Sequence, residues 1–87
     1  MHERALMRDV LTRVEEAART ERATRVTQVN VRLGALSHFT PEHFLEHFED
    51  AARGTIAEGA AVVAAVETDI AHPRASDVVV ESVEVER

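Results

Sequence analysis

The stretch Q-V-N-V-R-L-G, residues 28–34, alternates polar and apolar side chains and then breaks at a glycine. Val29, Val31 and Leu33 would lie on one face of a β-strand, because successive side chains of a strand point to opposite faces. The pattern therefore predicts a strand that is half-buried under other elements. Such a face must be covered, so helices are expected nearby in the chain.

Helices are predicted on both sides of this strand. From Glu3 to Thr20, apolar residues recur at helical spacing and form one continuous stripe. After the strand, Thr40 can cap a second helix with Pro41 at its first position, and this helix should run to about Arg53. Gly54 stands where the second helix should end.

Two further strands are predicted, from Ala60 to Ile70 and from Val78 to Val85. They are joined by a short loop at His72-Pro73, so we expect an antiparallel hairpin. In the last strand the alternation changes phase at Glu81-Ser82, where a β-bulge would keep the valines on both sides facing the core. The segment from Val29 to Ile70 should be a right-handed crossover with parallel strands.

The predicted order of elements is α-β-α-β-β. We therefore expect a two-layer α+β fold, in which two helices pack on one face of a mixed three-stranded sheet. Residues 1–87 should form a single domain with a small aliphatic core, because the chain has three phenylalanines and neither Trp nor Tyr.

Composition and charge argue against several classes of protein. Ten basic and sixteen acidic residues give a formal net charge of −6, which repels phosphate backbones, so nucleic acid is not an expected partner. The chain has no cysteine, which removes disulfides and thiolate-bound zinc or iron–sulfur clusters. The start M-H-E-R-A-L-M-R-D is too charged for a signal peptide, and no stretch has the length of a membrane span. We expect a cytoplasmic protein without membrane contact.

The first three residues, Met1-His2-Glu3, form a candidate metal site. The α-amine, the amide nitrogens of His2 and Glu3, and the His2 imidazole can converge on one ion. Such nitrogen donors in a tetragonal arrangement suit Ni(II) or Cu(II), and the Glu3 carboxylate can approach as a further ligand. The donor set does not choose nickel, because Cu(II) outranks Ni(II) at nitrogen ligands. The alternative interpretation is a simple helix start, with Glu3 near the positive end of the dipole.

A second candidate is H-F-L-E-H, residues 43–47, which has the H-x-x-E-H spacing of inverzincin peptidases. Such a site also needs a third protein ligand and a substrate cleft, for which this domain leaves little room, so we expect no enzymatic activity. His43, His47 and Asp50 share one helix edge and could form a weak surface metal site. We interpret them as a solvated polar edge. His38 and His72 fall in predicted loops and are expected to be surface residues.

Six motifs spread along nearly the whole chain resemble those of one family, the HypA/HybF nickel metallochaperones. They are M-H-E at residues 1–3, V-x-L-G-x-L-S at 31–37, P-E at 41–42, F-E at 48–49, G-T-x-A-E-G-A at 54–60 and E-S-V-E-V-E at 81–86.

The resemblance implies a non-enzymatic nickel-binding accessory protein for the maturation of nickel–iron hydrogenase or another nickel enzyme. It implies that Met1, His2 and Glu3 hold Ni(II), and that the protein docks with a HypB-like GTPase and the hydrogenase large subunit. The alternative, from a different class, is a protein–protein interaction module that keeps the fold without a metal role.

One departure from the family is the absence of its zinc module, which carries paired C-x-x-C motifs before the last strand. Here only Ala71 to Asp77 fill that position, so no zinc is expected. A domain this small often relies on a partner, and a three-stranded sheet has two open edges. We therefore also expect a homodimer or a hetero-complex.

Overall fold

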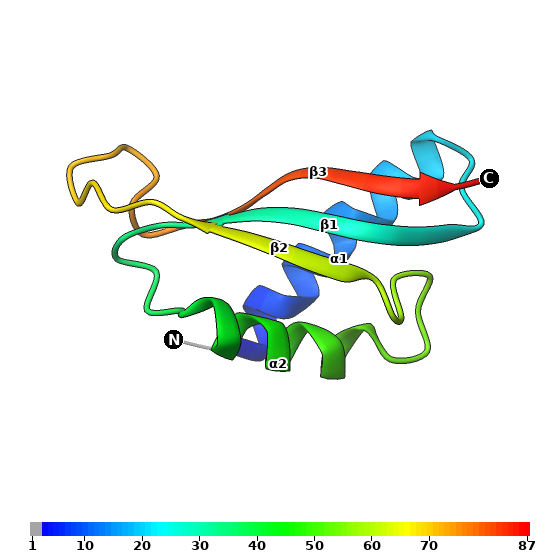
Figure 1. The fold of residues 1–87 in the computed structure, drawn as a ribbon, viewed down its shortest axis with the longest axis horizontal. Helices are drawn as coiled ribbons and strands as arrows, with labels where there is room; N and C mark the ends of the chain where they lie inside the picture. Colours follow the sequence, from blue (N-terminus) through cyan, green and yellow to red (C-terminus); the bar gives the residue numbers. More distant parts are fainter. Residues whose placement is uncertain (1–2) are drawn as a thin grey trace.

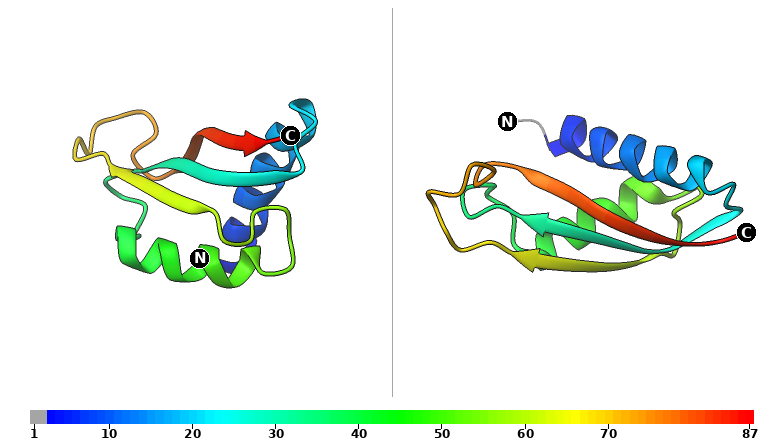
Figure 2. Two further views of the ribbon diagram at one scale, coloured as in Figure 1. Left: turned by 45° about the vertical axis from the view of Figure 1, so that its right-hand side comes forward. Right: turned by 90° about the horizontal axis from the view of Figure 1, so that it is seen from above.

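The computed structural model describes residues 3–87, and its elements follow the predicted order. Both helices pack on one face of a three-stranded mixed sheet, which confirms the expected two-layer α+β fold (Figures 1 and 2). The elements are α1 (Glu3–Thr20), β1 (Arg25–Leu33), α2 (Pro41–Ala52), β2 (Ala61–Val66) and β3 (Val78–Glu86).

The order of the strands is β2-β1-β3, with β1 in the centre. β2 runs parallel to β1, as predicted for the strand–helix–strand segment. β3 runs antiparallel to β1 on its other side. The predicted hairpin between the last two strands is therefore wrong, because β2 and β3 are both neighbours of β1 and not of each other. Residues 67–77 carry the chain past the end of β1 from one edge of the sheet to the other (Figure 1).

Burial explains why β1 takes the central place. Its inward side chains Val26, Val29, Val31 and Leu33 are at most 1% exposed. The strands β2 and β3 contain no fully buried residue. Placing β1 in the middle lets its apolar face meet the helices along its whole length, which removes the most apolar surface from water.

The strand boundaries differ from the sequence prediction, whereas the bulge is confirmed. β1 begins at Arg25, before the alternating stretch, and β2 ends at Val66 instead of Ile70. Asn30 pairs with Ser82 and Val31 with Val80, so Glu81 is the extra residue. A second irregularity, at Thr27, was not predicted. The Thr27 hydroxyl donates a hydrogen bond to the carbonyl of Glu84 at 3.1 Å.

The helix ends follow their sequence signals. α1 has the predicted bounds. The Thr40 hydroxyl accepts a hydrogen bond from the backbone N–H of His43 at 3.1 Å, which caps α2 with Pro41 in its first turn. Gly54, just after the Arg53 cap, has φ +81°. Across residues 3–87, neither helix is long and apolar enough to cross a bilayer.

The connection between β2 and β3 is held against the turn that follows β1. The N–H of Gly34 donates to the carbonyl of Asp77 at 2.9 Å, and the N–H of Leu36 donates to the carbonyl of Ala75 at 2.7 Å. Ala75 is 5% exposed. The segment Ala71 to Asp77 is thus packed onto the sheet end by backbone hydrogen bonds.

Candidate metal centre

Glu3 is the first residue of α1, and its carboxylate faces α2. One carboxylate oxygen, Oε2, lies 3.4 Å from Nε2 of His43. The other, Oε1, lies 3.2 Å from Nε2 of His47. Glu3 is one of the three predicted nickel ligands, and its carboxylate lies beside the imidazole nitrogens of His43 and His47. Met1 and His2 lie outside the residues that the structure describes.

His43 and His47 are one turn apart on α2, and their rings meet edge-on, with an interplanar angle of 61°. Their Nε2 atoms are 2.8 Å apart, and the ring centroids are 4.5 Å apart. Within residues 3–87, Glu3, His43 and His47 are the group whose metal-ligating atoms come within 4.8 Å of one another. Their side chains are 44%, 40% and 36% exposed, so an ion could reach all three from solvent.

Packing between α1 and α2 brings the three residues together. Glu3 shares a helix face with Met7 because side chains at i and i+4 lie one above the other. Met7 is 3% exposed. It lies in a groove between the helices, whose lining also includes Leu11 on α1 and His47 and Ala51 on α2. The histidine pair is thus half-buried beside α1 instead of lying on a free polar edge.

Phe39 supports both imidazole rings. Its ring centroid is 5.2 Å from that of His43 and 6.3 Å from that of His47. Phe39 also packs edge-on against the buried Phe44 at 5.8 Å. Phe39 precedes the cap residue and Phe44 follows it by four, which is the spacing of a hydrophobic staple. That spacing is the local sequence signal from which the supporting position of Phe39 could have been predicted.

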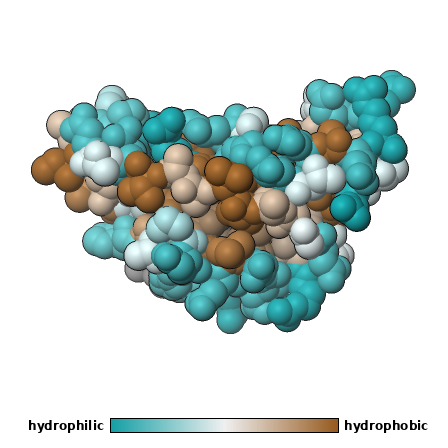
Figure 3. All heavy atoms as spheres, viewed as in Figure 1, coloured by the Kyte–Doolittle hydropathy of each residue, from teal (hydrophilic) through white to brown (hydrophobic). Residues whose placement is uncertain are grey.

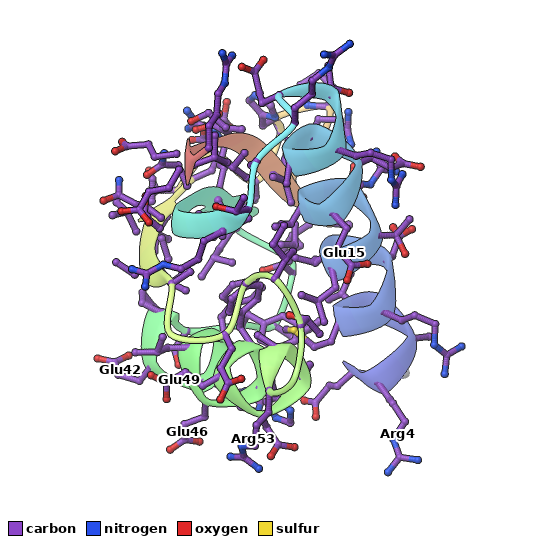
Figure 4. All side chains as sticks on the ribbon, turned by 90° about the vertical axis from the view of Figure 1, so that its right-hand side faces the viewer. Arg4, Glu15, Glu42, Glu46, Glu49 and Arg53 are labelled. Carbon is purple, nitrogen blue, oxygen red and sulfur yellow. The ribbon has the colours of Figure 1, made fainter. Side chains whose placement is uncertain are left out.

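The acidic residues of α2 do not join the cluster. Asp50, which the sequence grouped with the two histidines, lies with Oδ1 3.0 Å from Nη1 of Arg53. Glu46, the acid of the H-x-x-E-H pattern, projects outward from α2 together with Glu42 and Glu49 (Figure 4). A peptidase would need this glutamate beside the metal-bound water. The geometry therefore gives no support to that activity.

The remaining two histidines lie apart from this group. His38 is exposed and has φ +67°. The Nδ1 atom of His72 accepts a hydrogen bond from the N–H of Arg74 at 2.9 Å. Both lie in loops, as predicted, and neither belongs to the ligand cluster of residues 3–87.

Known proteins with similar sequences share one name, hydrogenase maturation factor HypA. The chain is 45% identical over 60 residues to the hydrogenase maturation factor HypA of Methylocella silvestris, an alignment that covers 69% of this chain and 53% of that protein. It is also 45% identical over 62 residues to the HypA of Dechloromonas aromatica, covering 71% and 55%. The chain thus spans about half the length of the curated relatives that it matches.

The fold has a counterpart among solved structures. The solution structure of the Ni metallochaperone HypA from Helicobacter pylori superposes with a TM-score of 0.80 at 17% identity, covering 99% of this chain and 98% of that one. Residues 1–85 match the family model described as "Hydrogenase/urease nickel incorporation, metallochaperone, hypA". The chain therefore belongs to the HypA family.

Proposed function

We propose that this protein is a nickel metallochaperone that holds Ni(II) through Met1, His2 and Glu3 and serves in the maturation of nickel–iron hydrogenase or another nickel enzyme. The observation that carries the proposal is the match of residues 1–85 to a family described by nickel incorporation, in a chain that begins M-H-E. Relatives named as hydrogenase maturation factors support the choice of client.

The start of α1 supports nickel binding through the backbone. Glu3 is the first residue of the helix, and the first four N–H groups of a helix have no acceptor within it. An ion can therefore replace the amide proton of Glu3 without breaking a helical hydrogen bond. The α-amine and the His2 imidazole would complete a nitrogen-rich site of the kind that Ni(II) accepts. The ion is cargo, and we expect no resident zinc bound by thiolates, because the chain has no cysteine.

The partners that we propose are a HypB-like GTPase and the hydrogenase large subunit, met in the cytoplasm. Glu42, Glu46 and Glu49 are exposed on the outer side of α2 (Figure 4). They add to a formal net charge of −6. Such a surface favours a partner with a basic face and disfavours nucleic acid.

The His2→Ala protein should lose the tight equivalent of Ni(II) that we expect the native protein to bind at its N-terminus. The substitution removes the one side-chain nitrogen of the N-terminal chelate, and the remaining amine and amides form a much poorer site. Isothermal titration calorimetry of Ni(II) into untagged protein with a free Met1 amine measures this loss.

Two controls accompany this titration. His72→Ala also removes one of the five histidines but lies in the loop after β2, so its Ni(II) binding should match that of the native protein. A short N-terminal extension displaces the free amine and should impair this tight binding as His2→Ala does. Unchanged tight binding by the His2→Ala protein would refute the proposed site.

A homodimer is the second part of the proposal, and the edge strand β2 supports it. Its sequence A-V-V-A-A-V has no charged residue, and its one partner among the described strands is β1. Val63 and Val66 are 50% and 51% exposed. A hydrophobic band crosses this face of the molecule (Figure 3). An uncharged, apolar strand edge is a template for pairing with another chain. This same edge favours the alternative function, an interaction module without a metal role.

Val63→Lys should convert the dimer to a monomer, because a charge on an edge strand opposes pairing. Light scattering over a dilution series at micromolar concentrations measures the mass. Ile70→Lys is the matched control, since Ile70 is 69% exposed but lies beyond the strand; this protein should still dimerise. A native protein that is monomeric at the highest concentration would contradict the homodimer.

A further inference from the structure

We propose that Glu3, His43 and His47 form a second metal site, which binds one divalent ion such as Ni(II) or Zn(II) between the start of α1 and the first two turns of α2. The site uses side chains alone and does not need the N-terminal amine. It therefore goes beyond the proposed nickel chelate and can be tested independently of it.

The distances between the three donor atoms suit a common ion. Two nitrogens bound at about 2.1 Å to one ion, at a right angle, are about 3.0 Å apart. The two histidine Nε2 atoms are 2.8 Å apart. The carboxylate oxygens are 3.2 and 3.4 Å from these nitrogens. Shifts of a few tenths of an ångström would bring all three donors into one coordination sphere.

The chemistry of the donors selects the class of ion. Two imidazoles and one carboxylate form a three-ligand face that leaves the remaining coordination positions open. Imidazole suits Ni(II), Zn(II), Cu(II) and Fe(II), whereas Ca(II) and Mg(II) require oxygen ligands. The site is thus suited to a late divalent transition metal, held by three protein ligands with water at the open positions.

The surrounding residues hold the donors in place before any ion arrives. Phe39 contacts both imidazole rings, and the stapled Phe44 anchors it to the core. One turn along α1 from Glu3, the buried Met7 lines the groove between α1 and α2 together with His47. Ligands positioned by packing lose less conformational entropy on binding, so a site with three protein ligands can still hold an ion.

An ion in this position would link two helices that come from distant parts of the chain. An ion that binds only the folded protein raises the free energy of unfolding. The gain grows with the logarithm of the ratio of ion concentration to dissociation constant. The N-terminal chelate uses the amide nitrogen of Glu3, whereas this site uses its carboxylate. Two ions can therefore bind next to each other, with Glu3 between them.

The test is a titration of Ni(II), and separately of Zn(II), into untagged native protein, the His43→Ala/His47→Ala protein and the His2→Ala protein. We expect two equivalents of Ni(II) for the native protein and one for each variant. Ni(II) should raise the melting temperature of the His2→Ala protein, and should raise that of the double-histidine variant less. His72→Ala is the control for the loss of a histidine, and it should bind two equivalents.

The variants should fold, because His43 and His47 are partly exposed and alanine is the best helix former. His43→Gln and His47→Gln keep a polar side chain and should also lose the second equivalent. Two equivalents bound by the double variant would overturn the second site and leave the N-terminal chelate intact. Absence of Ni(II) binding by the His2→Ala protein would also overturn the second site. An unaltered first equivalent in the His2→Ala protein would instead reject the proposed N-terminal site.

Discussion

Replacing Phe44 by alanine should lower the free energy of unfolding by about 3–5 kcal/mol. Phe44 is fully buried and packs between Phe39, at 5.8 Å between ring centroids, and Phe48, at 6.0 Å. Domains are stable by about 5–15 kcal/mol in total, so one cavity at this position removes a large part of the stability. Urea denaturation followed by circular dichroism measures the change.

Leu45→Ala is the matched control for this prediction. Leu45 is the next residue of the same helix and is only partly buried. Leucine and alanine both favour a helix, and the Leu45 side chain contributes less to the core than that of Phe44. The loss in free energy of unfolding should therefore be clearly smaller. A Phe44→Ala protein as stable as the Leu45→Ala protein would show that the aromatic cluster is not the centre of this core.

Gly34→Ala should lower the free energy of unfolding by about 3 kcal/mol or more, because the added methyl group meets backbone. An ideal Cβ at Gly34 would lie 2.6 Å from the carbonyl carbon of Ala75 and closer still to its oxygen. Backbone atoms cannot rotate away as a side chain can. The turn after β1 would have to separate from residues 74–77, which breaks the hydrogen bond from Gly34 to Asp77.

Gly54→Ala is the control for this steric effect, because it tests the strain of a left-handed backbone without a clash. Nothing lies within 4 Å of an added Cβ at Gly54, whose φ is +81°. The expected cost is the strain of a left-handed residue, about 1–2 kcal/mol. Thermal unfolding of both proteins compares the two effects. If Gly34→Ala were no more destabilising than Gly54→Ala, the close approach of Ala75 to Gly34, just after β1, would be disproved.

Local signals in the sequence predicted the elements better than their arrangement. The helical stripe gave the bounds of α1, and Thr40 with Pro41 gave the start of α2, since both signals lie within a few residues. The place of β3 depends on which strand has the most apolar face, a property of the whole sheet. Proximity in sequence favoured a hairpin, whereas the structure places β1, whose inward side chains are buried, between β2 and β3. Because β2 ends at Val66 and not at Ile70, 11 residues, 67–77, connect β2 to β3, which is a longer path than the predicted loop.

The candidate site was predictable only in part for the same reason. The spacing of His43 and His47 along one helix showed that they could share an ion. Their third neighbour, Glu3, comes from another helix, and no local pattern states how two helices pack. Asp50 was the nearest acid on the helix edge, but it pairs with Arg53. The role of Met1 and His2 remains a prediction from the M-H-E start and the family.

The central claim, a nickel site at the N-terminus, is tested most directly by anomalous diffraction at the nickel edge from crystals of untagged protein loaded with one equivalent of Ni(II). We predict that the strongest peak lies within coordination distance of the Met1 amine and the His2 imidazole. A strongest peak at any other place in the chain, with none beside His2, would contradict the claim.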